Sequence, residues 1–282
     1  MNILTFDIED WFHILDLEET EDVDSWHKYE SRLERNLEFI LDFLSKGGYK
    51  ATFFILGWIA EKYPEVIKKI FTNGFEVGCH SYSHILIYKN SRAKVKEDFE
   101  RSIKLLQDIS GNKVKYFRAP GFSITEKSKW AFDILVELGI EVDSSIFPAS
   151  RGHGGYENFP YALPCNLDIN GSLIRELPIN KVKFLGKEIV FSGGGYFRMI
   201  PYHLQKMLYN KTDYVMTYFH PRDFDPGQPV LHNLSFVRRV KSYIGLNSSK
   251  QKLNKLLSDF KFVDIKTAVN NIEWNNCPTI KI

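Results

Sequence analysis

Cysteine is scarce in this chain: Cys79, Cys165 and Cys277 are its three cysteines among 282 residues. An odd number of widely spaced cysteines argues against the disulfide framework that small secreted domains use. The composition therefore suits a reducing compartment. We expect Cys79, which ends an apolar stretch, to be a buried strand residue whose side chain points away from the neighbouring histidine.

The chain also lacks a long apolar run and an excess of one charge. No stretch reaches the roughly 18 residues of a membrane span, and Met1 leads into a strand-like segment without the basic and apolar regions of a secretion signal. We therefore expect no transmembrane segment and a cytoplasmic protein. The 37 basic and 35 acidic residues give a net charge of +2 and are interspersed, so no nucleic-acid partner is expected. The composition leaves the oligomeric state open.

Strand-like and helix-like segments alternate along the chain, which is typical of an α/β protein with a mostly parallel sheet. We expect strands at residues 3–7, 51–56, 75–79, 116–118, 141–144, 173–178, 214–219 and 262–265. We expect helices at residues 31–45, 59–72, 93–109, 125–138, 201–208 and 250–260. The length fits a single α/β barrel domain, residues 1–282. Irregular proline and glycine spacing predicts an inserted excursion with a hairpin around residues 147–187.

The run Gly193-Gly194-Gly195 resembles a phosphate-binding loop only in its glycines. No Gly-Lys-Ser/Thr follows it, and the chain has no Rossmann spacing. We expect a tight turn here and no nucleotide site.

The segment His80-Ser81-Tyr82-Ser83-His84 follows a strand-like run and carries two imidazoles four residues apart. Neutral imidazole is the commonest protein ligand of zinc-like ions, and side chains at i and i+4 of a helical turn point the same way. The pair is a candidate half-site for a divalent metal. On its own it is more often two neighbouring histidines with no metal, so further ligands must support it.

The N-terminal strand supplies acids in Phe6-Asp7-Ile8-Glu9-Asp10. Side chains alternate along a strand, so Asp7 and Glu9 are expected on one face and Asp10 on the other unless the chain has already entered a loop. Clustered carboxylates repel one another and so favour a bound cation, although an acidic loop capping a strand has the same composition. The residues alone leave open whether Glu9 or Asp10 would be the third metal ligand.

Two further strand-like segments end in reactive side chains, at Arg118 and His220. Each is weak by itself, because such an Arg is often a surface ion-pair partner and a His before Pro is often a packed or capping residue. In an α/β barrel, however, catalytic residues lie where the strands end. Four strand ends that carry acids, a His pair, an Arg and a His therefore predict one site.

The order of these motifs resembles that of the polysaccharide deacetylases, the NodB-homology carbohydrate esterases. The resemblance covers roughly residues 1 to 225 and rests on four segments: Phe6-Asp7-Ile8-Glu9-Asp10, His80-Ser81-Tyr82-Ser83-His84, Arg118-Ala119-Pro120-Gly121 and Tyr218-Phe219-His220. Two more segments resemble a bacterial subgroup linked to exopolysaccharide and exosortase gene sets: residues 143–148 and 193–198. The family resemblance implies an irregular (β/α) barrel of seven or eight mostly parallel strands.

The resemblance also implies roles for particular residues. Asp7 would be the catalytic base, His220 the acid, and Arg118 would hold Asp7 ionised and oriented. The metal, expected to be zinc, would be bound by His80, His84 and either Glu9 or Asp10. Many family members have two adjacent aspartates in the first motif, whereas this chain has Asp-Ile-Glu-Asp; members with Asp-x-Asp or Asp-x-Glu favour Glu9. Candidate substrate-binding residues lie inside the motifs: Tyr82, Pro120, Gly121 and Phe122.

The implied reaction is metal-dependent hydrolysis of an N-acetyl group from an amino sugar in a poly- or oligosaccharide or its precursor, in the biosynthesis of a cell-surface glycan. The expected partner is the acetylated amino-sugar glycan or its precursor. Amide hydrolysis needs an activated water, stabilisation of an oxyanion and a proton for the leaving amine, and the named residues are of the types that supply these. The alternatives are an O-acetyl esterase, a hydrolase of a small non-sugar amide, and an inactive carbohydrate-binding relic. A relic needs neither a base nor an acid, so the presence of Asp7 and His220 weighs against it.

Overall fold

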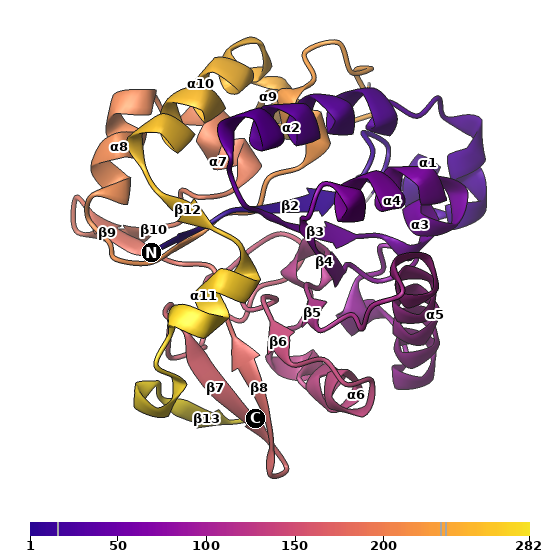
Figure 1. The fold of residues 1–282 in the computed structure, drawn as a ribbon, viewed down its shortest axis with the longest axis vertical. Coiled ribbons are helices and arrows are strands. Elements are labelled where there is room, and N and C mark those ends of the chain that lie inside the picture. Colours follow the sequence, from indigo (N-terminus) through magenta and orange to yellow (C-terminus); the bar gives the residue numbers. More distant parts are fainter. Residues whose placement is uncertain (16, 232, 235) are drawn as a thin grey trace.

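A mostly parallel sheet runs through the molecule in the computed structural model, which describes residues 1–15, 17–231, 233–234 and 236–282. The strand order of this sheet is β13-β7-β8-β6-β5-β4-β3-β2 (Figure 1). Five parallel ladders join β2 (Thr5–Ile8), β3 (Thr52–Ile55), β4 (Glu76–Cys79), β5 (Tyr116–Phe117), β6 (Val142–Asp143) and β8 (Ser172–Glu176). Strand β7 (Cys165–Ile169) is antiparallel to β8, and β13 (Thr279–Lys281) is parallel to β7. The expected α/β fold with a mostly parallel sheet is confirmed.

The first residues of the chain join this sheet to the C-terminal part of the molecule. Strand β1 (Asn2–Ile3) lies between β11 (Val215–Met216) and β12 (Phe262–Val263), parallel to both. Three residues later, Phe6 bridges Phe219 in the continuation of β11. The N-terminal segment therefore pairs with β3 along one edge, and along its other edge it contacts the residues that lead to His220.

The barrel expected from the sequence is not closed. Among the described residues, no backbone ladder connects the end of β8 to β11. Side chains bridge part of the gap: Asn180 Oδ1 accepts hydrogen bonds from Met216 N (3.1 Å) and Ser192 Oγ (3.3 Å). On this side, irregular strand ends thus take the place of the continuous strand pairing that a closed barrel would have.

The helices follow the apolar periodicity of the sequence. Helix α2 (Leu33–Gly47) buries Leu33, Leu37, Ile40, Leu41 and Leu44 and ends at Gly48, whose left-handed backbone (φ 65°) caps it. The single helix expected at 59–72 is two helices, α3 (Gly57–Lys62) and α4 (Pro64–Thr72), because Pro64 starts a new helix. Helix α5 (Arg92–Ser110) starts where Ser91 accepts a hydrogen bond from Lys94 N.

The remaining elements complete the layers around the sheet. The other α-helices are α1 (Glu18–Glu21), α6 (Ala131–Glu137), α7 (Gly194–Met199), α8 (Tyr202–Tyr209), α9 (Phe236–Tyr243), α10 (Leu246–Asp259) and α11 (Ile265–Asn271). A small antiparallel pair is formed by β9 (Val182–Phe184) and β10 (Lys187–Ile189). Short 3-10 segments cover Val23–Lys28, Ile87–Lys89, Pro120–Phe122, Glu126–Ser128, Pro221–Phe224 and Trp274–Asn276. In Figure 1, α2 and α4 lie above β2 and β3, and the β7–β8 hairpin projects at the bottom beside β13.

Three expectations are refined by these elements. The hairpin expected around residues 147–187 exists as β7 and β8, and β8 is a member of the main sheet. The tight turn expected at the triple glycine is wrong, because Gly194 begins helix α7. The three cysteines are free thiols, with Cys79 and Cys165 buried. No helix in the described part of the chain is long and apolar enough to cross a membrane.

Candidate metal centre and catalytic site

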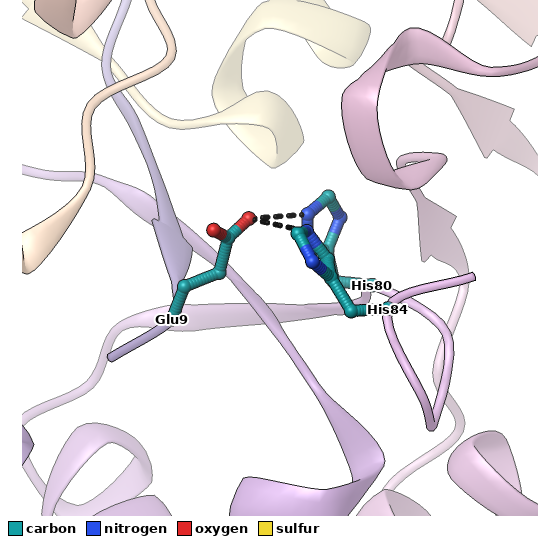
Figure 2. Close-up of side chains that lie close together, drawn as sticks. All are labelled: Glu9, His80 and His84. Carbon is teal, nitrogen blue, oxygen red and sulfur yellow. Dashed lines mark hydrogen bonds and ion pairs between the residues drawn. The ribbon is translucent and has the colours of Figure 1, made fainter. Parts of the chain in front are cut away.

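Glu9, His80 and His84 bring their ligand atoms together just beyond the ends of β2 and β4. Glu9 Oε1 lies 3.0 Å from His80 Nε2 and 2.9 Å from His84 Nε2. The three ligand atoms all lie within 4.8 Å of one another, and all three residues are buried. Figure 2 shows the carboxylate of Glu9 pointing at both rings.

The hydrogen bonds around these rings fit a cation. His80 Nδ1 lies 2.7 Å from the carbonyl oxygen of Arg118, and a carbonyl can only accept, so Nδ1 carries the proton and a neutral ring presents a bare Nε2 to Glu9. His84 Nε2 is buried and has no hydrogen-bond partner with acceptable geometry. A lone pair and a carboxylate that face each other in a buried site repel, and either a proton or a divalent cation between them removes that repulsion. Two imidazoles and one carboxylate are a donor set suited to zinc or a similar divalent ion.

The loop that presents the two histidines is not helical, so the expected helical turn is wrong. Ser81 and His84 both have left-handed backbones, with φ of 63° and 53°. Asp98 on α5 holds the loop, because its carboxylate accepts hydrogen bonds from Tyr82 N (2.7 Å) and Ser83 N (2.9 Å). The strained loop, and not an i, i+4 helix spacing, therefore turns both rings toward Glu9.

Asp10 lies outside this group. Its carboxylate accepts hydrogen bonds from Trp11 N (2.8 Å), Ser31 Oγ (2.5 Å) and Arg32 N (3.0 Å). It thus connects the end of β2 to the start of α2. Of the two acids that the sequence left open, Glu9 is the one that faces the histidines.

Asp7 and Arg118 form a buried ion pair beside the metal-ligand group. Arg118 Nη1 donates to Asp7 Oδ1 and to Thr5 Oγ1, each at 2.7 Å. Its Nη2 donates to Ser144 Oγ (2.9 Å) and its Nε to the Ser144 carbonyl (3.2 Å). The guanidinium is wholly buried, so the pair fixes the direction of the Asp7 carboxylate.

His220 reaches the same place from the opposite wall. Asp7 N donates to the Phe219 carbonyl (2.7 Å), which sets the next residue beside the acids. His220 Nε2 lies 3.9 Å from both Asp7 Oδ2 and Glu9 Oε1, and its side chain is 23% exposed. All five reactive residues expected at strand ends therefore converge: Asp7, His80, His84, Arg118 and His220.

Asp223 holds the other side of the His220 ring. Asp223 Oδ2 lies 3.1 Å from His220 Nδ1 and accepts from His220 N at 2.8 Å. Its second oxygen accepts from Arg198 Nε at 2.9 Å, and both side chains are 4% exposed. The chain of contacts Arg198, Asp223, His220 orients the imidazole so that Nε2 faces Asp7.

These contacts shift the pKa of two acids and of the imidazole. Burial raises the pKa of Glu9, but the charges and hydrogen bonds of the histidines around it outweigh burial and leave the pKa well below its usual value. Arg198 and His220 likewise outweigh burial and lower the pKa of Asp223. Burial lowers the pKa of His220, but the surrounding carboxylates outweigh it and raise the pKa to about 9. These carboxylates are Glu9, Asp223 and Asp7.

Comparison with known proteins finds two family models along the chain. The polysaccharide deacetylase model matches residues 4–142. A domain of unknown function, DUF3473, matches residues 144–270. The first half of the chain belongs to the polysaccharide deacetylase family.

A curated relative of this deacetylase-family chain is a peptidoglycan-N-acetylglucosamine deacetylase from Bacillus cereus. It is 37% identical over 100 residues, which are 34% of this chain and 36% of the relative. The match thus spans little more than a third of the relative's own length.

Solved structures share the fold across the whole chain. A Mycobacterium smegmatis protein classed with the polysaccharide deacetylases has a TM-score of 0.66 at 16% identity and covers 100% of this chain and 92% of its own. An allantoinase has a TM-score of 0.62 at 12% identity over 95% and 89% of the two chains. A CE4 family pseudoenzyme from Bacillus anthracis has a TM-score of 0.51 at 16% identity over 95% and 64%. These likenesses establish the fold, which a deacetylase-family protein therefore shares with proteins of differing activity.

A cavity of about 300 Å³ opens over the candidate site of this deacetylase-family protein. Glu9, His84, His220 and Asp223 line it together with residues from the DUF3473 segment. Of the four substrate-binding residues expected from the sequence, Gly121 lines this cavity. Pro120 and Phe122 are buried behind it.

Tyr82, the fourth expected substrate-binding residue, faces another direction. Its hydroxyl donates to Glu61, and the Arg101 guanidinium lies 3.7 Å from its ring centroid. These contacts attach the His80–His84 loop to α3 and α5. The structure thus gives Tyr82 a supporting position for the metal-ligand loop.

Three residues near the site were missed from the sequence: Asp223, Arg198 and His13. Asp223 lies three residues after His220, which is the N-cap of the 3-10 segment Pro221–Phe224. Its carboxylate accepts a hydrogen bond from the backbone N–H of His220, and that spacing is the sequence signal that could have found it. Arg198 lies in the segment noted for its triple glycine and its subgroup resemblance, with no role expected for the arginine. Gly194 is needed there, because a Cβ on it would overlap the Asp223 carboxylate. His13 accepts a hydrogen bond from Asp10 N on Nδ1 (3.0 Å), and no local pattern marks it.

Proposed function

We propose that this protein is a metal-dependent hydrolase that removes the N-acetyl group from an amino sugar. The observation that carries the proposal is the convergence of a two-histidine, one-carboxylate group with Asp7 and His220 beside a cavity that Glu9, His84 and His220 line. A candidate base and a candidate acid, Asp7 and His220, thus lie next to the three ligand atoms, with His220 Nε2 3.9 Å from both Asp7 Oδ2 and Glu9 Oε1. Amide hydrolysis requires that combination.

Glu9, His80 and His84 would hold the metal. A divalent ion there would polarise the acetyl carbonyl and lower the pKa of a bound water. The His-rich donor set favours zinc over iron or manganese. Asp10 would have no role in metal binding, because its oxygens are used by backbone and hydroxyl donors.

Asp7 would act as the general base. Its Oδ1 is held by Arg118, so Oδ2, the oxygen nearer His220, is the one that would take the proton of the attacking water. A buried guanidinium with four hydrogen bonds fixes that geometry better than an ammonium could. Orientation of a reacting group within a fraction of an ångström is worth large factors in rate.

His220 would act as the general acid. The carboxylates around it favour the protonated imidazolium, and Asp223 on Nδ1 leaves Nε2–H directed at the cavity. From there it would deliver a proton to the departing amine nitrogen. Base and acid thus come from different parts of the chain, Asp7 from β2 and His220 from the end of the β11 segment, which supports a single catalytic domain over residues 1–282.

The substrate class follows from the family. We infer that the substrate is an acetylated amino-sugar glycan or its precursor and that the reaction serves cell-surface glycan assembly. The resemblance to the subgroup linked to exopolysaccharide gene sets supports this assignment. Because an allantoinase shares the fold, hydrolysis of a small non-sugar amide is the second candidate function. Because a pseudoenzyme also shares the fold, catalytic activity is the first property to test.

The test combines metal content with acetate release. Elemental mass spectrometry is run on the wild type beside His80→Ala, His84→Ala, Glu9→Ala and Asp10→Ala. We expect near-stoichiometric metal in the wild type and in Asp10→Ala and its loss from the other three. Acetate release from acetylated chito-oligosaccharides and ring opening of allantoin to allantoate are then measured on the zinc-loaded protein; Asp7→Asn should keep the metal and lose turnover.

Other outcomes would overturn parts of the proposal. Metal lost from Asp10→Ala but kept in Glu9→Ala would reassign the third ligand. Metal lost from Asp7→Asn would make Asp7 a ligand. No acetate from a zinc-loaded wild type that still binds the oligosaccharide would leave a carbohydrate-binding relic.

A further inference from the structure

The cavity over the candidate site carries an excess of positive charge. Five cationic side chains line it: Arg151, Arg198, Arg222, Arg238 and Lys241. Among the described residues, two carboxylates line it, Glu9 and Asp223. Glu9 belongs to the metal-ligand group, and Asp223 is already shared by Arg198 and His220. Among the described residues, no other carboxylate lines the cavity beside Arg151, Arg222 and Lys241.

All five cations come from the segment that the DUF3473 model covers, residues 144–270. Arg198 is on α7, Arg222 is in the 3-10 segment Pro221–Phe224, and Lys241 is on α9. Glu9 and His84 come from the half that the deacetylase model matches. The second half of the chain thus builds a cationic wall opposite the ligands of the first half.

Arg151 is held by aromatic rings and not by an acid. Its guanidinium carbon lies 4.9 Å from the ring centroid of Phe122, 5.3 Å from that of Phe147 and 5.6 Å from that of Tyr218. Its Nη1 is buried and has no hydrogen-bond partner, and no described acid pairs with it. A half-buried guanidinium without a counter-charge is costly to desolvate, and an anion at the cavity would offset that cost.

Lys241 and Arg222 are also available to an anion. The ammonium of Lys241 is exposed and forms no ion pair with any described residue. Arg222 Nη1 donates a long hydrogen bond of 3.4 Å to the Trp11 carbonyl, and no described carboxylate is within ion-pair distance of it. Both side chains line the cavity that His220 and Glu9 line.

The lining also lacks the usual surface for a neutral sugar. Neutral pyranose rings are commonly bound against aromatic faces, which suit their apolar faces. Among the described residues that line this cavity, none is Phe, Tyr or Trp. Charge, and not stacking, is the feature that this wall offers to a ligand.

We infer that the DUF3473 segment selects an anionic substrate: an acetamido sugar that carries a phosphate or carboxylate group, bound by Arg151, Arg222 and Lys241 while the acetamido group faces Glu9, His80 and His84. The identity of the sugar rests on the proposed function; the anion site does not. A phosphate would be the group of a sugar phosphate or diphosphate precursor, and a carboxylate that of an acidic sugar.

The experiment compares substrates that differ in charge. Acetate release by the zinc-loaded wild type is measured with N-acetylglucosamine 1-phosphate, N-acetylmuramic acid and neutral di-N-acetylchitobiose. We expect kcat/KM for one of the anionic substrates to exceed that for the neutral one, and the ratio to fall as salt is raised. Whichever anionic substrate is preferred identifies the charged group as phosphate or carboxylate.

Variants test the wall itself. Lys241→Ala should lower the anionic-to-neutral ratio by about fivefold, mainly through KM, and Lys241→Arg should restore most of it. Arg151→Gln should lower the ratio further, by roughly tenfold. The matched control is Lys255→Ala on α10, which removes the same charge from a residue that does not line the cavity and should leave the ratio at its wild-type value.

Binding separates this inference from the proposed function. Calorimetric titration of Asp7→Asn with N-acetylglucosamine 1-phosphate and with N-acetylmuramic acid reports the anion site without turnover. Anion-dependent binding that weakens in the Asp7→Asn, Lys241→Ala double variant supports the site even if no substrate releases acetate. Equal kcat/KM for neutral and anionic sugars, or anion binding unchanged by Lys241→Ala and Arg151→Gln, would overturn it.

Discussion

Arg118 donates a 2.7 Å hydrogen bond to Asp7 from a guanidinium that is wholly buried. The same guanidinium donates to Thr5 and, on its other side, to Ser144. Nη1 thus holds Asp7 and also donates to Thr5 on β2, while the other two nitrogens donate to Ser144, the residue after β6. The contact ties the candidate base to the core of the sheet.

Replacement of this guanidinium should impair turnover without releasing the metal. Arg118→Lys keeps the charge but cannot make the forked contacts, so we expect kcat to fall by about a hundredfold and the free energy of unfolding to fall by roughly 3 kcal/mol. Metal should stay bound, because His80 is held by the backbone carbonyl of Arg118. Steady-state kinetics, chemical denaturation and metal content check the three outcomes.

Arg92→Lys is the matched control for that substitution. Arg92 pairs with Asp133 and Glu137 at the surface, so we expect its replacement to change stability by less than about 0.5 kcal/mol. An Arg118→Lys protein with wild-type kcat would show that Asp7 needs no orientation by the guanidinium.

Asp223 should set the protonation of His220. Because the carboxylates around His220 raise its pKa to about 9, removal of one of them in Asp223→Asn should lower that pKa. NMR titration of the His220 ring in metal-free protein measures the shift. In the pH profile of turnover, the alkaline limb should move to lower pH, since a general acid must be protonated to act.

Asp225→Asn is the control for Asp223→Asn. Asp225 is two residues away but pairs with Arg32 and Asn36, so its replacement should leave the His220 titration in place. An unchanged titration in Asp223→Asn would show that Glu9 and Asp7 alone determine the protonation of His220.

The triple glycine offers a test of close packing against the site. A Cβ at Gly194 would overlap the Asp223 carboxylate, whereas a Cβ at Gly195 would meet no atom of the described residues within 4 Å. Gly194→Ala should therefore lower the free energy of unfolding by about 1–3 kcal/mol. Gly195→Ala, one residue on in the same helix, should raise it by about 0.5–1 kcal/mol. Equal effects of the two changes on chemical denaturation would contradict the close approach of Asp223 to Gly194.

Strand ends were the part of the site that sequence could predict. Asp7, His80, Arg118 and His220 each follow an apolar strand-like run, and parallel strands end at one edge of a sheet, so their convergence follows from the local pattern. Alternation along β2 also placed Glu9 on the face of Asp7. A strand is present in each of the eight expected segments.

Other features depend on packing between distant segments. The left-handed turn at His84 is held by Asp98, fourteen residues on, which no periodicity within the motif reveals. The partnership of Asp223 with Arg198 exists only because α7 packs on the segment after β11. The open side of the barrel likewise reflects irregular strand ends near Asn180. Sequence patterns report local preference, and these contacts are made over long separations.

A buried pair of carboxyl groups away from the metal ligands predicts how stability varies with pH. Asp143 and Glu176 are register partners in β6 and β8, and both are fully buried. Asp143 accepts two hydrogen bonds from Ser145, whereas Glu176 Oε2 has no donor. Burial, and then the charge of Asp143, raise the pKa of Glu176 well above its usual value. A protonated Glu176 can donate to Asp143, so the proton resides on Glu176.

The sign of the effect follows from that raised pKa. Above the unfolded-state value of about 4.3 the unfolded chain has lost the Glu176 proton while the folded chain retains it, so stability falls as pH rises by up to about 1.4 kcal/mol per unit until the folded pKa is passed. Glu176→Gln carries a permanent donor in place of the proton. Chemical denaturation between pH 5 and 7 should therefore show a shallower decline in the variant. Glu137→Gln, at an exposed glutamate paired with Lys96, should leave the slope unchanged, and a Glu176→Gln slope equal to that of the wild type would mean that Glu176 is already ionised in the folded protein.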